Sequence, residues 1–412
     1  MTVPNAFLFF SALLLLSALL EPLANRVRIP FSIVLVITGF AGSEIATKQL
    51  GIDTGIRWEN FHSIIFFLIL PALVFHAAIN IAPGALRRNI IVILLLAIPM
   101  MLISTALIAV MVYFGIDHPA GFPWIAALLT GTLLSATDPA AVISLLQRAG
   151  APERLSLLLE GESLFNDATA IVLFSIIIAM ALPGSESPGT WSDAVPQFLR
   201  VFFGGLVFGS FTGLAAHFLI RLSGSTNSIV LLTVICAYGT YTIAELQLHV
   251  SGVMAVLAAG LMISCLDKHT GRNNDSQVTG FWGFLTWLAE ALIFLLAGVS
   301  ITLNMFTEQW LAMLTGIVAV IIARLVVVFS GFPLINRLPG VMPLPQRQQL
   351  ALVWGGVRGT VTLALALSLP LSLGYWYTVQ SIAYGVVLFT LFFQATSMGL
   401  VIGKRKPGGG VD

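Results

Sequence analysis

Acidic and amide side chains interrupt one of the most apolar stretches of the sequence. The segment LLLEGESLFNDATAIVLF, residues 157–174, contains the pair Asn166-Asp167 near its centre. Residues three and four apart share one face of a helix, which places Glu160, Ser163 and Asp167 together. Carboxylate, hydroxyl and carbonyl oxygens are the ligands that a small hard cation such as Na⁺ prefers. Burial disfavours the charged carboxylate and a bound cation stabilises it, so Asp167 is predicted to hold either a proton or a cation.

Another acid, Asp138, lies in the segment SATDPAAVISLL directly before Pro139. Proline removes a backbone donor and disfavours helix at the preceding residue, so a helix is predicted to break near Thr137 and Asp138. Inside a membrane, such a break is tolerated only where the backbone is buried in protein or lines a cavity. Asp167 is expected at the same depth as this break. The alternative is a simple proline kink in which the aspartate is satisfied locally.

A second interruption is predicted in LALVWGGVRGTVTLALALSLP, where Gly355, Gly356 and Gly359 surround Arg358. This span is the seventh membrane span after the first interrupted one. Because seven is an odd number, the two spans cross the membrane in opposite directions. Two interrupted spans in inverted positions indicate the binding site of a secondary transporter. The alternative is that the glycines only permit close helix packing.

Two arginines inside apolar segments, Arg324 and Arg358, carry permanent charges that need partners. The acids Glu162 and Glu290 are the candidate partners for structural ion pairs. We expect Glu162 to pair with one of the two arginines, which leaves Asp167 free to titrate. Charged residues within membrane segments are costly and usually functional.

The composition places these residues in a membrane. The chain has 412 residues, of which 58% are hydrophobic and only 9% charged, with a mean hydropathy of +0.99. Soluble domains carry about 25% charged residues, so the sequence predicts an all-α polytopic membrane protein. The net charge of +1, without basic runs before the C-terminal tail, does not indicate nucleic-acid binding. The cysteines, Cys236 and Cys265, are predicted core residues.

Scanning for about 20 mostly apolar residues gives about 13 spans in one membrane domain, residues 1–412. Their approximate bounds are 5–22, 31–47, 60–79, 89–115, 122–147, 155–182, 196–220, 227–246, 250–266, 279–301, 311–334, 349–372 and 377–402. The interrupted spans are the fifth and the twelfth. The region 227–266 is the most ambiguous, because the gap near His249 is very short.

The basic residues predict an orientation. Most Lys and Arg residues lie in the tail or in loops after odd-numbered spans, such as those with Arg87 and Arg148. Cytoplasmic loops collect these residues, so we expect the C-terminus in the cytoplasm and the N-terminus outside, in a cell (inner) membrane. The loop at 183–195 is predicted to separate the two halves of the chain.

Seven segments in order resemble the NhaP-type sodium/proton antiporters, the bacterial and archaeal relatives of the animal sodium/hydrogen exchangers. The resemblance covers nearly the whole chain. The matching segments are SATDPAAVISLL, EGESLFNDATAIVLF, HVSGVMAVLAAGLM, EALIFLLAGVSI, IIARLVVVF, LVWGGVRGTVTLALALSLP and LFFQATSMGLVI.

The resemblance implies an NhaA-like fold with inverted repeats of six spans joined by the seventh. It also implies a homodimer. A core at approximately 89–182 and 311–402 would carry the ion, and a dimerisation part would comprise approximately 1–80 and 196–301.

The resemblance also implies roles for single residues. Asp167 would bind the cation and the proton, with Asp138, Ser163 and Thr137 as further ligands or positioning groups. Asn166 beside Asp167 is typical of electroneutral relatives, which exchange one Na⁺ or Li⁺ for one H⁺ in pH homeostasis.

The sequence departs from the family at His76, where relatives usually carry an acid. His76 is therefore either a modulator of the site or a packed helix residue. Glu290 lies where animal exchangers carry an acid, and it is expected to be an arginine partner or a second proton site. Glu160 is expected at the cytoplasmic mouth.

Other functions fit the sequence less well. A K⁺/H⁺ antiporter of the same fold stays open. A gated cation channel would need ligand rings from several subunits rather than paired broken helices. No protease, HExxH or nucleotide-binding motif is present, so we expect neither an enzyme nor a cofactor.

Overall fold

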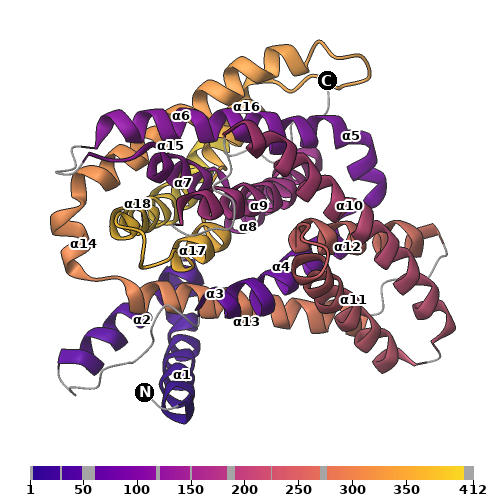
Figure 1. Cartoon of the computed structure of the whole chain (residues 1–412), viewed down its shortest axis with the longest axis horizontal. Coiled ribbons are helices and arrows are strands. Elements are labelled where there is room, and N and C mark those ends of the chain that lie inside the picture. The colour runs from indigo at the N-terminus through magenta and orange to yellow at the C-terminus, as the bar shows by residue number, and fades with distance from the viewer. Residues whose placement is uncertain are drawn as a thin grey trace.

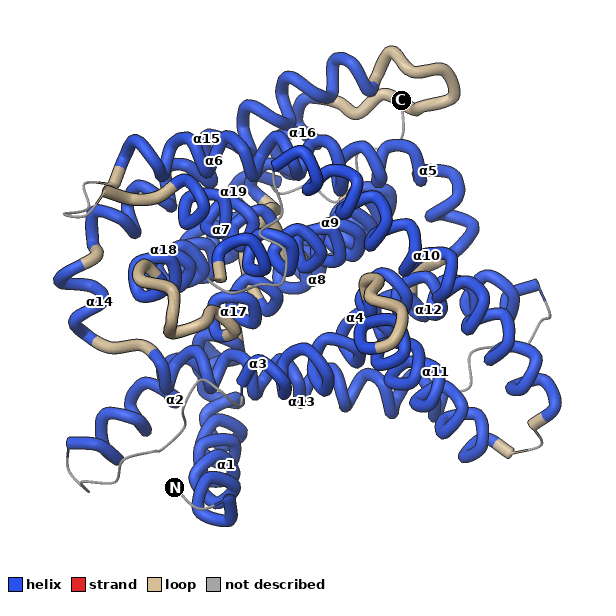
Figure 2. Tube along the Cα trace, in the orientation of Figure 1, coloured by secondary structure: helices blue, strands red, loops and turns tan. Residues whose placement is uncertain are grey.

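The computed structural model describes residues 3–27, 30–48, 61–116, 121–148, 151–182, 191–223, 225–269 and 276–402. Over these ranges the regular structure is helical and contains no strand (Figure 2). This follows from the sequence, because a long apolar segment in a bilayer must satisfy its backbone groups internally, and a helix does so within one segment.

The first part of the chain ends with α9, the helix that contains Asn166 and Asp167 (Figure 1). Its helices are α1 (Val3–Val27), α2 (Phe31–Lys48), α3 (Phe61–Ile64), η2 (Ile65–Ile69), α4 (Leu70–Asn80), α5 (Pro83–Leu95), η3 (Leu96–Met100), α6 (Met101–Gly115), α7 (Trp124–Ser135), α8 (Ala140–Arg148) and α9 (Glu153–Ala181). The helices of the second part are α10 (Trp191–Leu222), α11 (Thr226–Leu246), α12 (Gly252–His269), α13 (Ser276–Ser300), α14 (Leu303–Glu308), α15 (Trp310–Ile335), α16 (Gln346–Trp354), α17 (Thr360–Leu367), α18 (Trp376–Phe389), η4 (Thr390–Ala395) and α19 (Thr396–Ile402).

Each predicted span coincides with a helix or with consecutive helical pieces. Within the described ranges, eight helical stretches are long and apolar enough to cross a membrane, and four more apolar helices are shorter. The ambiguous region 227–266 forms two helices, α11 and α12. They are separated by a tight turn in which His249 has a φ of 51°. The all-α polytopic architecture is therefore confirmed.

Some details differ from the prediction. The predicted loop at 183–195 is shorter, because α10 begins at Trp191, and residues 183–190 lie outside the described residues. Three spans contain the π-helical segments η2, η3 and η4, and η3 includes Pro99. A proline removes one backbone donor and clashes with the preceding turn, which favours such a local widening.

The helices pack into two groups. In one group, α6 packs on α7 and α15, and α15 packs on α18. In the other, α10 packs on α12, α12 on α4, and α13 on α2. The two groups meet where α9 contacts α12 and where α13 contacts α17, which lie close together in Figures 1 and 2.

Small residues bring some of these helices very close. A Cβ added at Gly209 of α10 would collide with the backbone of Ala255 in α12. Gly298 of α13 is in the same situation against Val36 of α2. Close approach through glycine is a typical way for membrane helices to associate, because packing replaces the hydrophobic drive.

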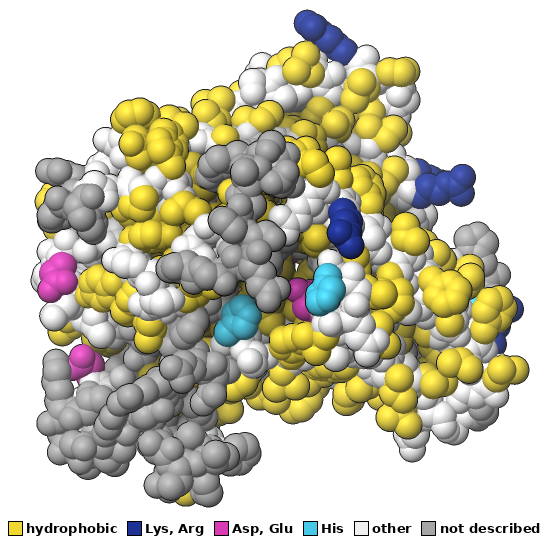
Figure 3. Space-filling view, viewed as in Figure 1, with side chains coloured by type: hydrophobic (Ala, Val, Ile, Leu, Met, Phe, Trp, Pro, Cys, Tyr) yellow, Lys and Arg dark blue, Asp and Glu magenta, His cyan; other side chains and the backbone are white. Residues whose placement is uncertain are grey.

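The surface agrees with a bilayer environment. Apolar side chains are spread over much of the described part of the face shown in Figure 3, and charged side chains are sparse there. Large apolar side chains such as Phe114 (76% exposed) and Leu222 (84% exposed) lie on the outside. In water these side chains would be unfavourable, whereas lipid chains accommodate them.

Candidate functional site

Two broken helices cross at the centre of the site. The first is interrupted between the end of α7 at Ser135 and the start of α8 at Ala140, and the second between α16 and α17. The backbone N–H of Asp138 donates to the carbonyl of Val357 at 2.7 Å, so the unwound segments lie side by side. A Cβ at Gly359 would collide with the Asp138 carboxylate, which explains why a glycine is needed there. Both predicted interruptions are confirmed.

Asp138 accepts hydrogen bonds from the starts of two half-helices. Its Oδ2 accepts from the backbone N–H of Thr360 at 3.1 Å and from the Thr360 hydroxyl at 3.0 Å. Its Oδ1 accepts from the N–H of Ala140 at 3.2 Å. Helix N-termini present unpaired N–H groups and partial positive charge, so both α8 and α17 stabilise this carboxylate.

Arg358 has the opposite role at the same crossing. Its side chain is only 1% exposed, and its Nε donates to the carbonyl of Leu134, in the last turn of α7, at 2.6 Å. Its Nη1 donates to the carbonyl of Gly356, just beyond α16. The guanidinium thus compensates the negative ends of two half-helices. The sequence left open which arginine pairs with Glu162; in the described part of the chain the side-chain partners of Arg358 are these carbonyls.

A buried ion pair joins α9 to α15. Arg324 donates to both carboxylate oxygens of Glu162, from Nη1 to Oε1 and from Nη2 to Oε2 at 2.9 Å. Arg324 also donates from Nη2 to the carbonyl of Leu352 at 3.2 Å. Glu162 is 1% exposed. Of the two arginines considered from the sequence, the structure therefore places Arg324 on Glu162, in the bidentate geometry that gives the strongest such pairs.

Asp167 lies beside the first break. Ser163 donates to the Thr137 carbonyl at 2.6 Å, and its Oγ is 3.4 Å from Asp167 Oδ2. Asn166 donates from Nδ2 to the Thr137 hydroxyl at 2.8 Å. Asp167 Oδ1 is buried without a hydrogen-bond partner among the described residues. Residues of α9 next to Asp167 thus contact the first break, which agrees with the expectation that Asp167 lies at its depth.

The remaining predicted residues lie around this centre. His76 on α4 is bonded to Asn80 in its own helix, with Asn80 Nδ2 2.9 Å from His76 Nδ1, and its ring packs near Gly283 of α13. Glu290 is half-buried on α13, a helix that contacts α17. Glu160 is half-buried one turn before Ser163 and Leu164 on α9.

The sequence left two roles open for Glu290, an arginine partner or a second proton site. Among the described residues Glu290 has no ion-pair partner, since Arg324 is occupied by Glu162 and Arg358 by backbone carbonyls. The pairing depends on which helix lies against each arginine, and Arg324 pairs with a residue of α9 and not with Glu290 of α13.

Two hydroxyl groups at the crossing were not anticipated. Thr360 binds Asp138, and the Oγ1 of Thr390 accepts from the backbone N–H of Arg358 at 3.1 Å. A threonine that follows a glycine-rich break is a typical helix-start residue, so Thr360 could have been inferred. Thr390 lies inside an apolar run and carries no comparable signal.

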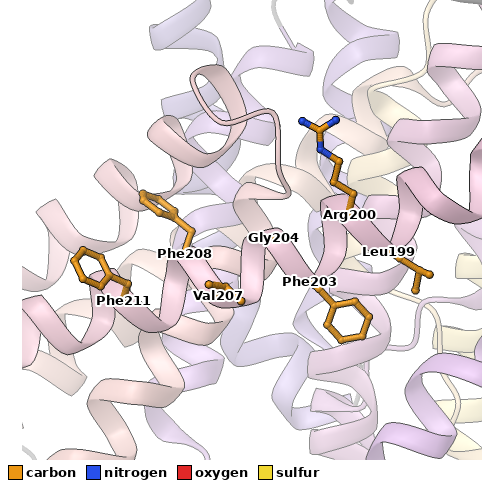
Figure 4. A pocket seen from close by; sticks show the side chains of 7 residues that line it. All are labelled: Leu199, Arg200, Phe203, Gly204, Val207, Phe208 and Phe211. Carbon is orange, nitrogen blue, oxygen red and sulfur yellow. The ribbon is translucent and has the colours of Figure 1, made fainter.

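A surface groove lies apart from these residues. It runs along α10, and Figure 4 shows the aromatic side chains and the single arginine that border it. Its lining is Leu199, Arg200, Phe203, Gly204, Val207, Phe208 and Phe211. All come from one helix and none is a predicted site residue, so this groove is not the ion site.

Comparison with known proteins identifies the family. The model of the family described as sodium/hydrogen exchanger, transmembrane, matches residues 11–403. The Na⁺/H⁺ antiporter ApNhaP of Aphanothece halophytica is 33% identical over 92% of this chain and 70% of its own length. The Na⁺/H⁺ antiporter NhaP of Pseudomonas aeruginosa is 33% identical over 91% of this chain and 88% of its own.

A solved structure shows the same fold. The sodium proton antiporter MjNhaP1 from Methanocaldococcus jannaschii superposes with a TM-score of 0.82 at 22% identity, covering 98% of this chain and 99% of that one. The resemblance noted in the seven sequence segments is therefore confirmed. With the family match over most of its length, the chain belongs to the sodium/hydrogen exchanger family of transmembrane proteins.

Proposed function

We propose that this protein exchanges Na⁺ or Li⁺ for H⁺ across the membrane, with Asp167 holding the cation and the proton in turn. One observation carries the proposal. Of the three acids around the first break, Asp138 and Glu162 accept hydrogen bonds on both carboxylate oxygens, whereas in the described part of the chain Asp167 has only the 3.4 Å contact of its Oδ2 with Ser163, and its Oδ1 has no partner. A buried carboxylate without compensation is costly, so a mobile cation must neutralise it.

The groups around Asp167 suit this role. Beside its carboxylate stand the Ser163 hydroxyl and the Thr137 carbonyl, which Ser163 joins through its 2.6 Å hydrogen bond. These are neutral oxygen donors of the kind that hard monovalent cations accept. Asp138 would add negative charge nearby, although hydrogen bonds from α8 and α17 occupy its oxygens. The loaded form and the protonated form both leave the site without net uncompensated charge.

The stoichiometry follows from the same count of charges. The residue beside Asp167 is the neutral Asn166, whose amide is bonded to Thr137. It adds no second titrating group. A single carboxylate that holds either one Na⁺ or one H⁺ predicts electroneutral, one-for-one exchange, driven by alternating access of this site to the two sides.

The test uses inside-out membrane vesicles with an imposed pH gradient. Added Na⁺ should dissipate the gradient in the wild type, and Asp167→Asn should abolish the response. The matched control is Glu153→Gln on the first turn of the same helix, which is exposed and should exchange like the wild type. Full exchange by Asp167→Asn would refute the assignment. Parallel runs with Li⁺ and K⁺ decide between a Na⁺ and a K⁺ exchanger.

The architecture suggests how the site alternates. We propose that a core of approximately 89–182 and 311–402 moves against approximately 1–80 and 196–301, which would form a homodimer. The N-terminus would be outside and the C-terminus in the cytoplasm of the cell (inner) membrane, as the positions of Lys and Arg predict. Transport would need no cofactor and would serve pH homeostasis. Cysteine crosslinking between α13 and α17 during turnover would test the motion, since these helices are in contact.

A further inference from the structure

The second break is supported by a residue that the exchange mechanism above does not use. Thr390 begins the π-helical segment η4, directly after α18, and is 1% exposed. Its Oγ1 accepts from the backbone N–H of Arg358 at 3.1 Å. The same hydroxyl can donate to the carbonyl of Arg358, at 3.3 Å, or to that of Val387, at 3.1 Å.

The Arg358 N–H has need of this acceptor. It lies in the unwound segment between α16 and α17, and Arg358 is buried. At the crossing, the backbone N–H groups of Asp138 and Arg358 have different acceptors. The N–H of Asp138 donates to the Val357 carbonyl of the other broken helix, whereas the N–H of Arg358 donates to the Thr390 hydroxyl. A buried N–H without an acceptor costs its full desolvation, so the Thr390 hydroxyl stabilises this backbone conformation.

The backbone at Arg358 in turn places its guanidinium. From that position the side chain reaches the Leu134 carbonyl at the end of α7 and the Gly356 carbonyl beyond α16. A shift of the backbone would separate the guanidinium from both carbonyls. Thr390 is thus hydrogen-bonded to the backbone of Arg358, whose guanidinium compensates the ends of α7 and α16.

The first break has a parallel arrangement. There Ser163, from α9, holds the Thr137 carbonyl by its hydroxyl. In each half of the chain, a hydroxyl from the span that follows the broken helix therefore holds the unwound segment. The second hydroxyl comes from a π-helical turn, a feature that is frequent at functional sites.

We propose that Thr390 is a positioning residue for cation–proton exchange, acting by holding the unwound segment at Arg358. The inference rests on the proposed function for its transport readout. In the described part of the chain the hydrogen bonds of Thr390 go to Arg358 and Val387 and not to Asp167. We therefore expect its hydroxyl to affect how fast the crossing moves rather than how tightly the ion binds.

The transport test compares Thr390→Val, which keeps the shape without the hydroxyl, with Thr390→Ser, which keeps the hydroxyl. In reconstituted vesicles, Thr390→Val should lower the maximal exchange rate per folded protein about ten-fold, with the apparent KM for Na⁺ within about three-fold of wild type. Thr390→Ser should restore most of the rate. The control is Ser381→Ala on α18, which should leave exchange unchanged, because its buried hydroxyl donates to the Tyr377 carbonyl of its own helix.

Hydrogen–deuterium exchange provides a readout that does not depend on transport. Peptides covering 355–360 should take up deuterium faster in Thr390→Val than in wild type or Thr390→Ser, because the Arg358 N–H loses its acceptor. Thr390→Ala replaces the valine variant if that variant does not fold. Wild-type rates in Thr390→Val, equal losses in Thr390→Val and Thr390→Ser, or unchanged deuterium uptake would each overturn the proposal. An inactive wild type with the expected uptake pattern would overturn the proposed function and leave the contact standing.

Discussion

Substitution of Arg324 should lower the free energy of unfolding more than almost any other single substitution near the site. The side chain donates to both oxygens of Glu162 and to the Leu352 carbonyl, and Glu162 is 1% exposed. Arg324→Met would therefore leave a buried carboxylate with no compensating charge. Breaking one side of a buried pair costs about 3–5 kcal/mol. The carbonyl that loses its donor adds roughly 1 kcal/mol.

The double variant makes this reasoning refutable. Replacing both Glu162 and Arg324 by methionine removes the uncompensated charge, and apolar pairs of similar volume are often as stable as the ion pair. The double variant should therefore lie within about 1–2 kcal/mol of the wild type, although each single variant is severely destabilised.

The assay is unfolding of the purified protein by SDS titration in mixed micelles, followed by tryptophan fluorescence. Arg337→Met, which removes an exposed arginine at the end of α15, serves as the control and should change the free energy of unfolding by less than about 0.5 kcal/mol. An Arg324→Met variant as stable as this control, or a double variant as unstable as the sum of the singles, would refute the assignment.

Three further outcomes are expected. Gly359→Ala should destabilise the protein and slow exchange, because the added Cβ would collide with Asp138. Gly374→Ala is the control, since a Cβ there meets no atom within 4 Å and should have neither effect. The SDS titration and the vesicle assay compare the two variants. Competition at Asp167 predicts that the apparent KM for Na⁺ rises as pH falls, by about ten-fold per pH unit at the acidic limit for one proton. An apparent KM for Na⁺ that stays constant from about pH 5 to about pH 8 in the vesicle assay would contradict this. His76→Glu should leave ion selectivity and the pH profile unmoved, because the ring bonds Asn80 in its own helix; an altered Li⁺/Na⁺ preference would give His76 a role in the site.

The sequence alone determined the spans and the two breaks. Apolar runs of membrane length predict helices wherever the chain lies in lipid, since no other open structure satisfies the backbone there. Pro139 after Asp138, and the glycines around Arg358, are local signals that interrupt a helix whatever surrounds it. The same local logic placed Ser163 and Asp167 on one helix face, and the structure sets that face against Thr137.

Only the tertiary structure decided which charges meet. Arg324 and Glu162 are 162 positions apart, and Thr360 and Asp138 are 222 apart, so helix periodicity contains no information about either contact. The sequence left two arginines and two glutamates with several pairings. Packing of α9 against the second half of the chain brings Glu162 to Arg324 and leaves Arg358 facing the helix ends. Within the described ranges it also leaves Glu290 without an arginine partner. The crossing needs those helix ends compensated before any side-chain pair forms, because four half-helices meet there and their unpaired backbone groups are buried.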